Sequence, residues 1–181
     1  MAQQTKYDRA RNVLTVPHGL MATMVESDVE EPVLALPLSA SLMRLLLPQP
    51  EGPYSWKDGH DQHLAYVTEC FRSVHNASLD VDGNATLLKE LIYESALLGP
   101  LFDVYRKAIF ESFDAEVYLH DRYNNWQLFY VFWTMTHCGD PQRADLVNAV
   151  LRNSVRFTRS FDCGLRDAMY QRRKCNFWVY W

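Results

Sequence analysis

The stretch that decides the fold is Gln127–Trp178, which begins QLFYVFWTMTHC at residues 127–138. It continues with NAVLRNSVRF at 148–157, SFDC at 160–163 and KCNFW at 174–178. Three of the chain's four cysteines lie here, together with a dense group of aromatic residues that each bury a large area on packing. We therefore expect a buried structural block against which the rest of the chain packs. An aromatic ligand groove is the less favoured interpretation.

The composition is that of an ordinary globular protein. The 181 residues are 48% hydrophobic and 22% charged, so a single domain is expected over residues 1–181. The net charge of -4 and the absence of a basic stripe with interleaved aromatics argue against a nucleic-acid-binding protein. No apolar run reaches the roughly 18–20 residues of a membrane span. The N-terminal sequence MAQQTKYDRAR lacks the apolar core of a signal peptide.

Hydrophobic spacing predicts a mainly α fold, α+β at most. Residues 12–20, NVLTVPHGL, favour a short strand that ends at Pro17. Helices are expected at residues 33–47, from about 62, from about 85, at 101–113, at 126–136 and at 144–151.

Other segments are expected to interrupt or follow these helices. His75–Asn84 is polar and ends in a turn, and Gly99-Pro100 is expected to break or kink the helix that contains it. The chain after Leu151 is predicted to be an irregular tail that cysteines hold in place.

Two features are typical of an exported protein. Asn76-Ala-Ser and Asn84-Ala-Thr are both glycosylation acceptor sequences. The cysteine spacing matches neither a CxxC pair nor a zinc site built from two such pairs, and it suits long-range disulfides. The four cysteines are Cys70, Cys138, Cys163 and Cys175.

No catalytic motif is recognisable from its spacing alone. The chain has no H-E-x-x-H, no G-x-S-x-G and no phosphate-binding glycine loop. His60 and His63 stand three residues apart, but polar residues at a helix start are the favoured interpretation over a metal pair. Adjacent side chains on a helix diverge, which argues against a catalytic dyad of His137 and Cys138. 

Two carboxylates, Glu90 and Glu94, stand four residues apart on one predicted helix face. Paired carboxylates can perform acid–base chemistry. A solvated helix face is the favoured interpretation on spacing alone.

An ordered set of sequence blocks resembles the C-terminal part of the neprilysin and endothelin-converting-enzyme family of zinc metallopeptidases. Each block is weak by itself, and the set in this order is fairly specific. The blocks are NVLTVPHGL at 12–20, TECF at 68–71, VDGNATL at 81–87, QLFY to Cys138, VNAVLRNSVRF to Cys163, and KCNFW at 174–178. The resemblance implies the helical subdomain of a zincin-like metallopeptidase with a short N-terminal strand. It also implies an extracellular location or the ectodomain of a membrane protein.

The departures from the family pattern fall on the zinc site. The family's H-E-x-x-H is expected between Gly19 and Trp56, yet residues 19–59 contain no histidine. The resemblance places Glu90 at the position of the third zinc ligand and Glu94 at the carboxylate that orients a ligand histidine, provided that one residue is inserted before Glu90. Catalytic zinc requires three protein ligands and a water, so no metal is expected.

Two further family elements are altered. The substrate-binding N-A-Y-Y corresponds to Gln4–Tyr7 and keeps only Tyr7. The late H-x-P…R, which stabilises the oxyanion, is expected between Cys138 and Val147, where no histidine occurs.

These losses predict a catalytically inactive, truncated peptidase domain without catalytic residues. It would act as a secreted binding or decoy protein for a peptide or protein ligand, or be vestigial. The alternatives are an active metalloendopeptidase whose zinc site is not recognised, and a fragment of a longer peptidase, because the family's N-terminal region is missing.

The resemblance also implies a disulfide between Cys70 and Cys175. The counterparts of Cys138 and Cys163 pair with the family's N-terminal region, which leaves these two free, paired with each other, or part of an incomplete chain. Val179–Trp181 extends beyond the family's usual end, and the resemblance does not explain these residues.

Overall fold

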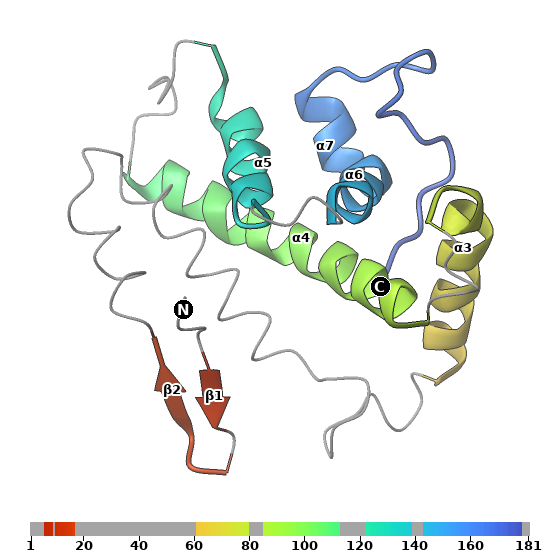
Figure 1. Ribbon diagram of the computed structural model, residues 1–181. Helices are drawn as coiled ribbons and strands as arrows, with labels where there is room; N and C mark the ends of the chain where they lie inside the picture. Colours follow the sequence, from red (N-terminus) through yellow and green to blue (C-terminus); the bar gives the residue numbers. More distant parts are fainter. Residues whose placement is uncertain are drawn as a thin grey trace. The chain divides into compact units, whose positions relative to one another are not determined.

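The computed structural model describes residues 6–8, 10–16, 61–79, 85–112, 122–138 and 143–178. These ranges are mainly helical (Figure 1), which confirms the predicted fold class. The elements are β1 (Lys6–Asp8), β2 (Val13–Thr15), α3 (Asp61–Leu79), α4 (Ala85–Ser112), α5 (Asn125–Met135), α6 (Ala144–Asn153) and α7 (Val155–Ser160). The helix predicted at 33–47 lies outside the described residues.

The chain divides into two compact units. The first comprises Met1–Pro48 and Leu101–Thr136, and the second comprises Gln49–Pro100 and His137–Trp181. The boundary therefore falls inside α4, next to Pro100. That residues 1–181 form one domain stays a prediction.

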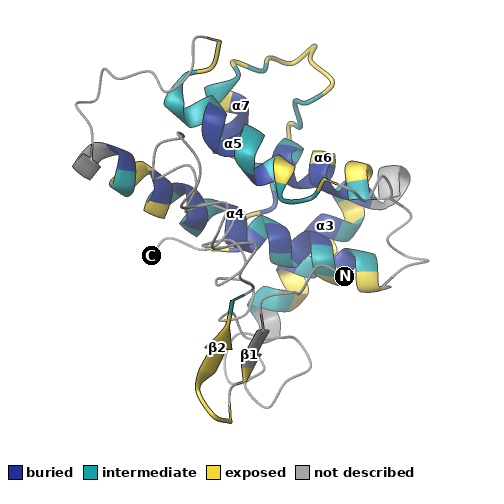
Figure 2. Cartoon of the chain, turned by 60° about the vertical axis from the view of Figure 1, so that its left-hand side comes forward, coloured by how far each residue is buried: buried dark blue, intermediate teal, exposed yellow. Residues whose placement is uncertain are grey.

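The first unit contains a short antiparallel hairpin. β1 pairs with β2 in the register Lys6↔Thr15, and Asn12 in the turn has a positive φ of 52°. Asparagine tolerates this left-handed conformation better than most residues. β2 is exposed along its whole length (Figure 2), so the short strand predicted before Pro17 forms at Val13–Thr15 with exposed side chains.

Aromatic packing between α4 and α5 forms the core of the first unit. Phe102 of α4 meets Phe129 edge to face, with ring centroids 5.1 Å apart, and stacks on Tyr130 at 5.7 Å. The hydroxyl group of Tyr105 donates a hydrogen bond to the carbonyl of Asn125 (3.0 Å), and burial raises the pKa of Tyr105. The core interpretation of this aromatic block is thus supported, although the outer face of α5 is partly exposed.

The start of α5 is fixed by a capping box. The Asn124 side chain accepts from the backbone N–H of Gln127 (2.9 Å), and the Gln127 side chain accepts from the backbone N–H of Asn124 (3.1 Å). This reciprocal pair satisfies two backbone donors at the helix start.

The second unit is built on the apolar faces of α3, the first half of α4 and α6. Val67 and Phe71 of α3 are fully buried, as their spacing predicts. α3 continues to Leu79, so the expectation that His75–Asn84 forms a connection is wrong for its first half. His75 occupies the buried face of this last part of α3, which extends the apolar stripe by another turn.

The predicted irregular tail is also partly wrong. α6 extends to Asn153, and α7 follows at once because Ser154 caps it by accepting from the N–H of Phe157 (3.2 Å). Phe157 is buried and its ring lies 4.8 Å from that of Phe161. The tail becomes irregular only after Ser160.

Pro100 does not break α4, contrary to one of the two expectations for Gly99-Pro100. A proline inside a helix cannot donate to the carbonyl four residues earlier, here that of Ala96. The indole Nε1–H of Trp178 donates to this carbonyl instead (2.7 Å). Glycine at position 99 removes one further obstacle, because the proline ring clashes with the backbone N–H and the Cβ of the residue before it, and glycine has no Cβ.

The Trp178–Ala96 hydrogen bond predicts an energetic coupling between Trp178 and Pro100. Trp178→Phe should lower the free energy of unfolding by about 1–2 kcal/mol, because the part-buried carbonyl loses its donor. In a Pro100→Ala background the loss should be smaller by on the order of 1 kcal/mol, since the new backbone N–H can bond Ala96. Urea unfolding of the four proteins measures this coupling. Equal losses in both backgrounds would contradict it.

No helix in the described ranges is long and apolar enough to cross a membrane.

Candidate functional site

The two carboxylates singled out in the sequence lie one turn apart on α4, and each faces a different basic group. Glu90 accepts a hydrogen bond from the Arg143 guanidinium (2.9 Å), and both side chains are about 40% exposed. Glu94 is buried, and its Oε2 lies 3.9 Å from Nε2 of His137, whose side chain is also buried. The expectation of a solvated carboxylate face is therefore wrong for Glu94.

The described part of the chain contains no group of three or more His, Cys, Asp or Glu residues that could hold a metal ion. His63 lies within 2.7 Å of the carbonyl of Phe177, to which its Nε2 can donate. His60 and the whole segment from Gly19 to Trp56 lie outside the described residues. The loss of the zinc-binding motif thus stays a sequence-based prediction.

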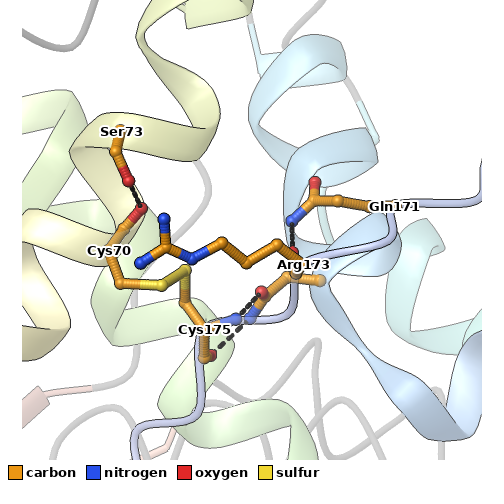
Figure 3. Close-up of a disulfide and its surroundings, with 6 residues drawn as sticks. Cys70, Ser73, Gln171, Arg173 and Cys175 are labelled. Atoms are coloured by element: carbon orange, nitrogen blue, oxygen red, sulfur yellow. Dashed lines mark hydrogen bonds between the residues drawn. A yellow bond between two sulfur atoms is a disulfide. The ribbon is translucent and has the colours of Figure 1, made fainter.

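A disulfide joins Cys70 of α3 to Cys175 near the end of the described chain (Figure 3), with a Cα–Cα distance of 5.8 Å. This is the pairing that the family resemblance implies. Both half-cystines are buried.

Residues Lys174–Trp178, which we call the C-terminal strap, are hydrogen-bonded to α6. The buried Asn153 donates from Nδ2 to the carbonyl of Cys175 (2.9 Å) and accepts its N–H at Oδ1 (2.7 Å). Lys174 donates to the carbonyl of Arg152. The strap is therefore fixed to α6 by side chains, in addition to its covalent bond to α3.

The remaining cysteines, Cys138 and Cys163, form no disulfide in the described structure. Cys138 is exposed and Cys163 is half-buried. Burial, reinforced by the Asp167 carboxylate, raises the pKa of the Cys163 thiol. Which of the alternatives that the sequence leaves open applies to these two cysteines stays a prediction.

The acceptor asparagine of the first glycosylation sequon, Asn76, lies in the last turn of α3. The second, Asn84, lies outside the described residues. Glycosylation of either stays a prediction.

A cavity of about 300 Å³ opens in the second unit between α4, α6, α7 and the strap. Two arginines line it, and Arg156 donates from Nη1 to the carbonyl of Gly99 (3.2 Å). The hydroxyl of Ser95, also in its lining, is buried and has no hydrogen-bond partner among the described residues. Apolar walls are supplied by Leu98, Val150, Val155 and Phe177.

Sequence reasoning missed this cavity and its arginines. Arg156 and Arg159 stand three residues apart on a helix that was expected to be irregular chain. The sequence did indicate that a donor was needed near Pro100, because a proline inside a helical pattern leaves one carbonyl without its usual N–H. It did not indicate that the donor is Trp178, which lies 82 residues from Ala96 in the sequence.

Searches of protein-family models, of curated proteins and of solved structures found no match to this chain.

Proposed function

We propose that this chain is a non-catalytic relative of the neprilysin-like metallopeptidases that binds a peptide or protein ligand outside the cell. The ordered sequence blocks motivate the family assignment, and the Cys70–Cys175 disulfide agrees with it. An exported location suits this disulfide, because reducing compartments disfavour such bonds.

The ion pair between Glu90 and Arg143 is the main support for the proposal that the chain is not a catalyst. Glu90 stands where the resemblance places the third zinc ligand, and its carboxylate accepts a charge-assisted hydrogen bond from a guanidinium at 2.9 Å. A cation is thus already present at this carboxylate. Glu94, at the position of the orienting carboxylate, faces the buried His137.

Native mass spectrometry of the oxidised chain, after incubation with zinc and buffer exchange, should show no retained zinc. One carboxylate cannot replace three protein ligands, so Arg143→Ala, which frees Glu90, should retain none either. Treatment with a chelator serves as the matched reference spectrum.

Stoichiometric zinc in the unmodified chain would overturn the proposal. So would hydrolysis of a small apolar peptide that the chelator abolishes, because that would show an active metallopeptidase. In that case Glu90→Gln should remove both the zinc and the activity, which identifies Glu90 as a ligand.

A further inference from the structure

The cavity in the second unit has the charge of an anion site. The described residues that line it include Arg156 and Arg159 but no aspartate or glutamate. The guanidinium of Arg159 has no hydrogen-bond or ion-pair partner among the described residues, and the residue is exposed. A guanidinium binds carboxylates and phosphates through paired N–H donors, so one that lies beside a cavity without a partner in the described part of the chain favours an anionic ligand.

The rest of the lining is suited to an apolar group. Leu98, Val150 and Val155 supply aliphatic walls, and Phe177 supplies an aromatic one. The cavity, at about 300 Å³, is at the small end of ligand pockets, large enough for one side chain with its polar end group. Apolar walls with a few polar groups at one side are the usual composition of such sites.

We propose that this cavity binds the carboxylate of a small acid with an apolar body, supplied either as a free organic acid or as the C-terminus of a peptide. The proposal rests on the binding function proposed above and assigns it a site. Arg159 receives the carboxylate, and the apolar body lies against the aliphatic walls. Ser95, whose buried hydroxyl has no hydrogen-bond partner among the described residues, lies within the lining as an additional polar group.

The strap makes this site dependent on the folded C-terminal end. Cys175, Asn176, Phe177 and Trp178 contribute one wall, and the disulfide together with Asn153 holds that wall in place. Arg156 is fixed by its bond to the Gly99 carbonyl. The site is therefore formed before a ligand arrives, which reduces the ordering cost of binding.

Isothermal titration calorimetry with N-acetyl-phenylalanine and with its uncharged amide tests the proposal on the intact, oxidised chain. The acid should bind at least about tenfold more tightly than the amide, because only the acid offers a charge to Arg159. A tetrapeptide acid that ends in phenylalanine distinguishes the two sources. Binding of the tetrapeptide assigns the site to peptide termini, and binding of the small acid alone assigns it to free acids.

Arg159→Gln should weaken binding of the acid about tenfold and leave the amide unchanged. Arg166→Gln is the matched control, because it removes the same charge from an exposed arginine of the same unit that does not line the cavity. Circular dichroism checks that both variants are folded.

Equal affinity for the acid and the amide would overturn the proposal, as would binding of neither up to roughly millimolar concentration. Equal effects of the two arginine variants, or inorganic phosphate binding as tightly as the acid, would overturn it as well. These failures leave the zinc experiment unaffected. A chain that retains zinc would instead refute the non-catalytic function without bearing on the cavity.

Discussion

Replacing Cys70 and Cys175 together by alanine should lower the free energy of unfolding by about 4–5 kcal/mol. The bond closes a loop between residues 105 apart in sequence, and the entropy that a cross-link removes from the unfolded chain grows with loop length. Domains are typically stable by about 5–15 kcal/mol, so a loss of this size removes a large fraction of the total. Urea unfolding followed by circular dichroism measures it.

The matched controls are the two cysteines outside the disulfide. Cys138→Ala and Cys163→Ala each remove a thiol without opening a loop, and both should change stability far less than the double variant. An unchanged unfolding midpoint in the Cys70→Ala/Cys175→Ala protein would contradict the prediction. It would mean that Asn153 and the other strap contacts alone hold the C-terminal end.

Local patterns in the sequence predicted much of the second unit correctly. A helix was predicted at residues 144–151 from its apolar spacing, and the four residues that this spacing places on one face are all buried in α6: Leu146, Val147, Val150 and Leu151. The start of α4 at Ala85 was predicted as well, since a polar turn precedes a regular apolar stripe. 

The error at Gly99-Pro100 has a different physical origin, which is compensation from a distant residue. Pro100 normally ends a helix, but the indole of Trp178 supplies the donor that the neighbouring carbonyl loses. Tertiary contacts can override local propensity in this way, because part of the cost of a proline inside a helix is the carbonyl that loses its donor, and a distant side chain can supply that donor. No window of sequence around Gly99 contains that information.

The candidate site was harder to predict than the fold. The spacing of Glu90 and Glu94 indicated a shared face, but the partners that distinguish them, Arg143 and His137, come from a segment more than 40 residues away. The cavity likewise combines residues from four segments. Spacing rules describe one element at a time, so they identify candidate residues without showing which residues meet.

Acidification from about pH 7.5 to about pH 5 should destabilise the protein by about 2 kcal/mol through His75 alone. His75 lies on the buried face of α3, is 1% exposed, and stacks on Phe71 with ring centroids 5.8 Å apart. Burial, with a smaller contribution from the positive charge of Arg152, lowers its pKa from 6.5 to about 4. The folded chain therefore holds this imidazole neutral, while the unfolded chain protonates it below about pH 6.5.

The direction of the change in stability follows from the number of protons that each state binds. Between the two pKa values the unfolded state binds more protons than the folded state, so stability falls as pH falls through this window. Carboxylates also titrate near its lower end, so the measurement is the difference between the unmodified chain and His75→Gln. Urea unfolding at both pH values should show a loss about 2 kcal/mol smaller in His75→Gln. An unchanged loss in His75→Gln would show that His75 is not its source.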